Sequence, residues 1–173
     1  MRVLFYCSAC ADIAPEYNEA ARRLVRAAVS RGYEIVSGGT VKGTMGVICD
    51  EASSLGASVR GVLPRFMEPL VHPGLTDIVW TETMAARKEA MREGADVVIA
   101  LPGGIGTMDE LFETLVLAKL GRFGGRIAAL NIGGFYDPLD ALLDHFVKTG
   151  MLEQHDRDRL HLPETVEELE ELL

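Results

Sequence analysis

The sequence predicts a doubly wound α/β fold, in which a mainly parallel sheet carries helices on both faces. Short apolar runs without polar alternation, typical of strands buried on both faces, recur along the chain. Segments with apolar residues at helical spacing separate these runs, and two glycine-rich turns follow strand ends. The 173 residues are 48% hydrophobic and contain no linker or internal repeat. We therefore expect a single domain over residues 1–173.

In the first half of the chain, each element follows from its local pattern. Residues 3–7 form an apolar strand, and the next helix begins at Pro15 and is closed by Gly32. The elements that follow are a strand over 34–37, a helix over 43–55, a strand over 59–63, a loop over 64–75 with three prolines, and a strand over 78–80.

The second half continues the alternation. Its predicted elements are a helix over 82–93, a strand over 96–101, a helix over 107–120, a last clear core strand over 126–131, a helix over 138–149 and a short acidic helix after Pro163. The acidic side chains of the terminal helix are expected to form a solvated face. Such a Rossmann-like sheet binds ligands at the carboxyl ends of its strands, where both glycine-rich turns fall.

The strongest functional signal is Pro-Gly-Gly-Ile-Gly-Thr over residues 102–107. This loop follows a strand and opens a helix, so it presents backbone N–H groups at a helix N-terminus, where phosphate is the usual ligand. The expected phosphate contacts are Gly103, Gly104, Gly106 and Thr107. A dinucleotide fingerprint would need a glycine at Asp109, and the turn before Thr44 lacks the lysine of a nucleoside-triphosphate loop.

Glu110 is the candidate catalytic acid beside this loop. A carboxylate there can stabilise oxocarbenium character in a sugar and orient or deprotonate a water molecule. Thr107 and Glu110 also have the spacing of a capping box, which is the purely structural alternative. A cap needs none of the three glycines, and this favours the chemical role.

Arg87 is the second catalytic candidate. It shares the apolar stripe of its helix with Met84 and Met91, and a buried arginine needs an acid or an anion as its partner. The helix descends about 12 Å from Arg87 to the next strand, which climbs about 20 Å to the glycine loop. The difference, roughly 8 Å, is about the reach of an arginine side chain, so Arg87 can point at the loop that carries Glu110. The alternative is a surface ion pair with Glu82, Glu89 or Glu93.

Two further features carry weaker signals. Gly43 and Thr44, in the second glycine-rich turn, are expected to supply a substrate-binding amide and hydroxyl, although a plain helix start explains them nearly as well. Cys7 and Cys10 have redox or metal spacing, but the next helix starts too late and no further cysteine pair or histidine completes a zinc site. We therefore expect no metal and no cofactor, and the four scattered histidines receive no chemical role.

The net charge and the apolar segments of the chain limit which partners the protein can have. A net charge of −9 argues against nucleic acid, because a polyanion would be repelled. The N-terminus has the pattern of a strand and no apolar run reaches about 18 residues, so we expect no membrane association and a cytoplasmic location. Val116, Leu117 and Leu120 extend the apolar face of their helix beyond its core stripe, which predicts a symmetric homodimer.

Five motifs together resemble those of the Lonely Guy (LOG) family of cytokinin riboside 5′-monophosphate phosphoribohydrolases. They are P-G-G-x-G-T-x-x-E at 102–110, R-K at 87–88, G-G-x-x-x-G-x-M-G at 38–46, H-P-G-L-T at 72–76 and G-G-F-Y-D-P at 133–138. The resemblance, over residues 3 to about 150, implies a Rossmann-type homodimer that hydrolyses the N-glycosidic bond of AMP or N6-substituted AMP in cytokinin biosynthesis. It implies that Arg87 and Glu110 are the catalytic pair, that the glycine loop contacts phosphate and that Lys88 contacts the nucleotide.

The chain departs from the family pattern where a base would be recognised. Ala85 replaces a usual histidine, Pro69 replaces a usual substrate-contacting glutamate, and Ala9 and Cys10 replace serines. The resemblance therefore implies better preserved chemistry than base specificity. The alternative function is a non-catalytic binder of a nucleotide or phosphate ligand, similar to molybdenum-cofactor carriers. Relatives often bear the label lysine decarboxylase, but the four lysines here lack the motifs of a pyridoxal enzyme.

Overall fold

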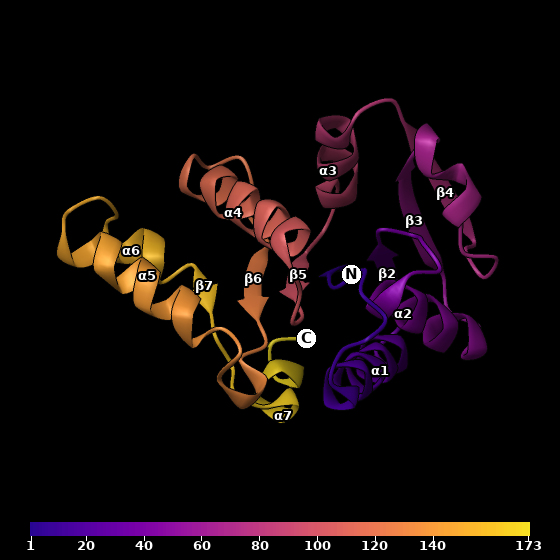
Figure 1. The fold of residues 1–173 in the computed structure, drawn as a ribbon, viewed down its shortest axis with the longest axis horizontal. Helices are drawn as coiled ribbons and strands as arrows, with labels where there is room; N and C mark the ends of the chain where they lie inside the picture. The colour runs from indigo at the N-terminus through magenta and orange to yellow at the C-terminus, as the bar shows by residue number, and fades with distance from the viewer.

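A computed structural model describes all 173 residues, and its centre is a seven-stranded parallel sheet (Figure 1). The strand order is β4-β3-β2-β1-β5-β6-β7, and every neighbouring pair is parallel. The strands are β1 (Arg2–Tyr6), β2 (Glu34–Ser37), β3 (Val59–Pro64), β4 (Asp77–Thr81), β5 (Val97–Ala100), β6 (Arg126–Ala129) and β7 (Leu160–His161). The predicted doubly wound fold is confirmed.

Helices cover both faces of the sheet (Figure 1). One face carries α1 (Pro15–Ser30), α2 (Gly43–Ser54) and α7 (Val166–Glu170), and the other carries α3 (Met84–Arg92), α4 (Ile105–Lys119) and α5 (Asp137–Lys148). The 3-10 helices η1 (Arg65–Leu70) and η2 (Ile132–Gly134) and the short α6 (Gln154–Arg157) lie in connections. In β1, Val3 and Phe5 belong to the first core and Leu4 and Tyr6 to the second. Burial on both faces explains why the strands lack polar alternation.

Most predicted elements lie within two residues of their observed bounds, but η1 lies inside the segment predicted as a loop over 64–75, and η2 was not predicted. Two further differences lie near the C-terminus. The sheet continues beyond the strand predicted as the last one, because β7 pairs with β6 through Ile127 and Leu160. Helix α6 was also missed. A two-residue strand and a four-residue helix among charged side chains are too short to produce a periodic pattern.

The chain order across the sheet places a crevice between β1 and β5. Strands β1 to β4 build one half outward, and α3 then brings the chain back to β5, which lies beside β1. The chain leaves β1 toward α1 on one face and leaves β5 toward α4 on the other face. Connections that diverge in this way open a ligand crevice at the carboxyl ends of the two strands.

Candidate active site

A cavity of about 310 Å³ occupies this crevice. It is formed by the segments that follow β1, β2 and β5 together with residues of η1, α2, α3 and α4. Among the residues predicted for the site, the cavity is lined by Arg87, Gly104, Gly106, Thr107 and Glu110. The structure therefore brings the candidate catalytic pair and the glycine loop to one hollow.

The glycine loop presents unpaired amides at the start of α4. The first hydrogen bond of the helix runs from the Met108 N–H to the Gly104 carbonyl at 3.1 Å, so the amides of Ile105, Gly106 and Thr107 have no acceptor in the chain. The Thr107 hydroxyl is also buried without a hydrogen-bond partner. An anion at this helix N-terminus would satisfy these donors.

Glycine at position 103 is a steric requirement of the loop. A Cβ there would lie 2.2 Å from the Thr107 Oγ1 and 2.8 Å from its Cβ. Contacts under 3.0 Å force the neighbouring atoms to move, so a larger residue would open the loop at Thr107. Gly103 does not line the cavity, and its contact with phosphate stays a prediction.

Arg87 and Glu110 form a buried ion pair. The Arg87 Nη1 donates to the Glu110 Oε1 at 2.9 Å, and its Nε donates to the Val62 carbonyl at 3.0 Å. Arg87 is 6% exposed and Glu110 is 8% exposed. The Arg87 Nη2 and the second carboxylate oxygen of Glu110 have no partner in the chain, which leaves one donor and one acceptor for a ligand in the cavity.

The start of α4 and this ion pair exclude the two structural alternatives that the sequence left open. A capping box would need Thr107 as the N-cap, but Gly104 has that position and Thr107 lies within the helix. Arg87 points inward to α4 rather than to a glutamate of its own helix. The estimated reach from Arg87 to the glycine loop is therefore confirmed.

Burial raises the pKa of Glu110 above its ordinary value, because the charged form loses water. The charge of Arg87 and its hydrogen bond lower this pKa without cancelling the effect of burial. A carboxyl group with a raised pKa exchanges its proton more readily near neutral pH, which suits acid–base chemistry.

Lys88 on α3 forms ion pairs with two acidic residues of α4. Its Nζ lies 2.9 Å from both carboxylate oxygens of Asp109 and 2.8 Å from the Glu113 Oε2, and these hydrogen bonds raise its pKa. Arg92 extends the network to Glu113 at 3.2 Å. Lys88 does not line the cavity, and its contact with the nucleotide stays a prediction. The network fixes the helix that carries Arg87 against the helix that carries Glu110.

Gly43 and Thr44 pack the start of α2 against the segment after β1. The Thr44 N–H donates to the Ser8 carbonyl at 3.0 Å, and its hydroxyl donates to the Asn18 Oδ1 at 2.9 Å. Gly43 has a φ of +50°, and a Cβ there would lie 2.6 Å from the Ala9 carbonyl carbon. Both polar groups of Thr44 are thus engaged within the chain, and substrate contacts by this pair stay a prediction.

Methionines form the apolar side of the cavity. Met45, Met67, Met84 and Met91 line it together with Phe5. Helical spacing predicts Met84 and Met91 on one stripe, but no pattern in the sequence places a methionine in the cavity, because the four come from three separate segments. Flexible, polarisable thioethers adapt well to a planar aromatic ring such as a nucleobase.

Cofactor and metal chemistry can be tested against the same residues. Pyridoxal phosphate needs a lysine amine in its site, but none of Lys42, Lys88, Lys119 and Lys148 lines the cavity. The cavity therefore does not fit a pyridoxal enzyme. All three cysteines are free, and no group of three or more acidic, histidine or cysteine side chains is placed to hold a metal ion. No helix has the length and apolarity to cross a membrane.

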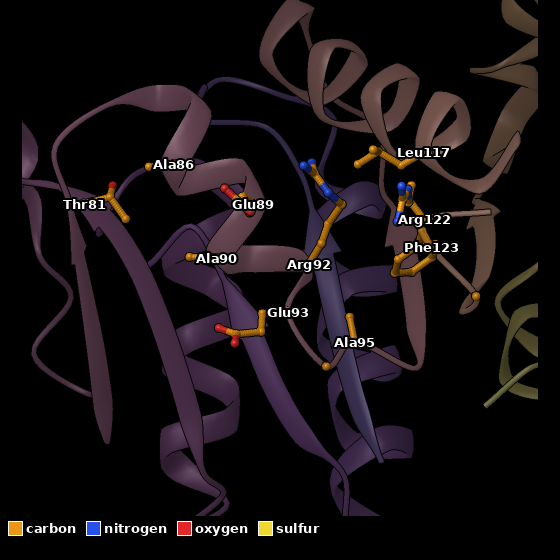
Figure 2. Close-up of a pocket in the computed structure, with 12 residues that line it drawn as sticks. Thr81, Ala86, Glu89, Ala90, Arg92, Glu93, Ala95, Leu117, Arg122 and Phe123 are labelled. Carbon is orange, nitrogen blue, oxygen red and sulfur yellow. The ribbon is translucent and has the colours of Figure 1, made fainter. Parts of the chain in front are cut away.

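A larger hollow of about 780 Å³ lies between α3 and α4 (Figure 2). Its walls include Ala86, Ala90 and Arg92 from α3, Leu117 from α4, and Arg122 and Phe123 beyond α4. It shares no lining residue with the active-site cavity, and it contains neither the loop amides nor the ion pair. This second hollow, the α3–α4 groove, has no catalytic group in common with the site.

Comparisons with known proteins show which proteins this chain resembles. A family model described as "Possible lysine decarboxylase" matches residues 45–173. The probable cytokinin riboside 5′-monophosphate phosphoribohydrolase LOGL1 of Oryza sativa subsp. japonica is 35% identical over 170 residues, which cover 97% of this chain and 76% of the relative. The cytokinin riboside 5′-monophosphate phosphoribohydrolase of Mycobacterium marinum is 36% identical over 163 residues, which cover 91% of this chain and 85% of the relative.

Solved structures share the fold at lower identity. The molybdenum cofactor carrier protein from Chlamydomonas reinhardtii superposes with a TM-score of 0.73 at 19% identity, covering 98% of this chain and 93% of that one. At this identity the likeness shows a common architecture alone.

Proposed function

The chain belongs to the LOG family of cytokinin riboside 5′-monophosphate phosphoribohydrolases, and on this basis we propose that it hydrolyses the N-glycosidic bond of nucleoside 5′-monophosphates. The substrates are AMP or N6-substituted AMP, and the products are the free base and ribose 5-phosphate. The observation that carries the proposal is the buried pair of Arg87 and Glu110 in a cavity that also holds the unpaired amides of α4.

The glycine loop binds the 5′-phosphate in this proposal. The amides of Ile105, Gly106 and Thr107 and the Thr107 hydroxyl supply donors without other partners, and the N-terminus of the 15-residue α4 adds a favourable dipole. Phosphate binding at the N-terminus of α4 then fixes the ribose relative to Glu110, because Glu110 lies on the same helix.

Glu110 acts on the sugar. As the bond between C1′ and the base nitrogen breaks, its electron pair leaves with the base and positive charge develops on the ribose. The free oxygen of Glu110 stabilises this charge and accepts a proton from the attacking water, whose oxygen bonds to C1′, and the departing base takes up a proton. Arg87 holds the other carboxylate oxygen, and its unpaired Nη2 is available to the substrate.

We also propose a cytoplasmic homodimer that closes each nucleotide cavity. Val116 on α4 and Leu120 at its C-cap are 53% and 64% exposed, and Leu117 between them lines the α3–α4 groove (Figure 2). Exposed apolar side chains beside an open groove favour a protein interface. A second copy related by a two-fold axis would cover this surface.

A direct assay tests the proposed activity. Purified protein is incubated with a panel of nucleoside 5′-monophosphates, and free base and ribose 5-phosphate are measured by chromatography. We expect release of adenine from AMP or of the free base from N6-substituted AMP. Tight binding of these nucleotides without any release would instead support the non-catalytic binder, for which the buried ion pair would have no chemical use.

A further inference from the structure

The G-G-F-Y-D-P segment at 133–138 has no part in the chemistry above, although it follows β6 at the same edge of the sheet as the active site. Gly133 and Gly134 have φ values of +62° and +74°, in the left-handed region that favours glycine. A Cβ on Gly134 would also lie 2.6 Å from the Asp137 Oδ2. The two glycines therefore allow a tight turn that no other residue type would adopt without strain.

Asn131 fixes this turn from the end of β6. Its Oδ1 accepts the Tyr136 N–H at 2.6 Å, and its Nδ2 donates to the Asp137 Oδ1 at 2.8 Å. One side chain thus holds both Tyr136 and Asp137, which follow the glycines and Phe135. The consequence is a fixed backbone position for Tyr136.

Tyr136 reaches from this turn to the start of the phosphate loop. It is 2% exposed, and its hydroxyl donates to the Leu101 carbonyl at 2.7 Å. The Leu101 N–H donates to the Tyr6 carbonyl at 2.8 Å, so Leu101 is held from both sides. Burial raises the pKa of the Tyr136 phenol, which keeps the hydroxyl protonated and able to donate.

The segment between Leu101 and α4 makes few hydrogen bonds of its own. Pro102 has no N–H to donate, and the amides of Ile105, Gly106 and Thr107 are unpaired. Glycines also leave the backbone free to adopt other conformations. The Leu101 carbonyl therefore fixes the start of the segment that leads into the unpaired amides at the first turn of α4.

We propose that Tyr136 is a positioning residue that holds the phosphate loop in its binding geometry through the Leu101 carbonyl. This inference rests on the proposed function of the loop as a phosphate site. Loss of the hydroxyl would leave a buried carbonyl unpaired and loosen the loop, while the Arg87–Glu110 pair would stay in place. The defect would therefore fall on phosphate binding rather than on the glycosidic step.

The test compares Tyr136→Phe with Tyr33→Phe. Tyr33 is a matched control, because its hydroxyl donates to the Leu173 carbonyl at 2.6 Å, away from the cavity. We expect Tyr136→Phe to raise the KM for AMP and the inhibition constant of inorganic phosphate by about tenfold, with kcat changed by less than about threefold. Tyr33→Phe should lower the melting temperature without changing either constant.

Two outcomes would overturn the positioning role of Tyr136. If Tyr136→Phe lowers only the melting temperature, as the control does, the hydroxyl has a purely structural role and the proposal is overturned. If the wild-type protein releases no base, the proposed function fails, but calorimetric titration of the same variants with AMP still tests the inference. Affinity about tenfold weaker in Tyr136→Phe than in Tyr33→Phe supports the positioning role, and equal affinity overturns it.

Discussion

Gly38 lies so close to Arg87 that a Cβ at position 38 would come within 2.3 Å of the Arg87 Nη2. The same Cβ would lie 2.6 Å from the Met45 Sδ. The absent side chain therefore provides the space in which the guanidinium reaches Glu110. The two glycine-rich turns differ in function, because one exposes backbone amides and the other makes room for an arginine.

This contact predicts the effect of Gly38→Ala. Arg87 is anchored at Val62 and Glu110, so it cannot move without losing a hydrogen bond. We expect AMP hydrolysis to fall at least about tenfold and the free energy of unfolding to fall by about 1–3 kcal/mol, the usual effect of overpacking. Kinetics and urea unfolding measure the two effects. Full activity in this variant would show that the position of the guanidinium is not critical.

Glu110→Gln tests the role of the carboxylate. The change keeps the size of the side chain but removes the negative charge, so kcat should fall by roughly two to four powers of ten while AMP still binds. Glu113→Gln is the matched control, since Glu113 lies on the same helix, pairs with Lys88 and Arg92, and does not line the cavity. Its effect on kcat should be much smaller. Near-normal turnover in Glu110→Gln would contradict the catalytic assignment.

The 5′-phosphate should be required for cleavage. Without it, the loop amides and the Thr107 hydroxyl would stay unpaired, and the sugar would lose its anchor. We therefore expect AMP to be cleaved and adenosine to be cleaved far more slowly at the same concentration. Chromatography of released adenine gives both rates, and equal rates would rule out the loop as a phosphate site.

The pH dependence should report the raised pKa of Glu110. If the ionised carboxylate takes the proton from water, the acid limb of kcat/KM should lie above the ordinary glutamate value of 4.5. Arg87 lowers this pKa, so Arg87→Met should move the limb to still higher pH. A limb at or below 4.5 would contradict the assignment.

The same shift has a consequence for stability. The folded protein binds the Glu110 proton more tightly than the unfolded chain does. The stabilisation of the folded state that this raised pKa provides is therefore fully present below the unfolded pKa of Glu110. That stabilisation is lost as the pH rises through the folded pKa. Unfolding curves of the wild type and Glu110→Gln across this range should differ in slope with pH.

The proposed dimer can be tested at its exposed apolar residues. Light scattering at micromolar concentration should give twice the chain mass of 18.8 kDa. Leu120→Glu, at the exposed C-cap of α4, should shift the protein toward the monomer, because a charge in an apolar interface is costly. Leu142→Glu on α5, where the leucine is 42% exposed, is the control. A stable, active monomer of the wild type would contradict the proposal.

The sequence by itself determined the fold class, the glycine loop and the pairing of Arg87 with the loop region. These depend on local properties: strands buried on both faces lack alternation, glycines before a helix expose amides, and the rise per residue of helix and strand sets the height of Arg87. Arg87 reaches this region because α3 and β5 are consecutive elements, so the lengths of the two elements set its height.

Only the tertiary structure decided which partners the side chains have. In the structure, Gly104 rather than Thr107 is the N-cap of α4, and the Arg87 Nε donates to the Val62 carbonyl. Lys88 forms ion pairs with the carboxylates of Asp109 and Glu113. The fold also joins Tyr136 to Leu101, 35 residues earlier in the chain. Such contacts depend on how distant elements cross and pack, to within the length of a hydrogen bond, and no periodicity along the chain records that distance.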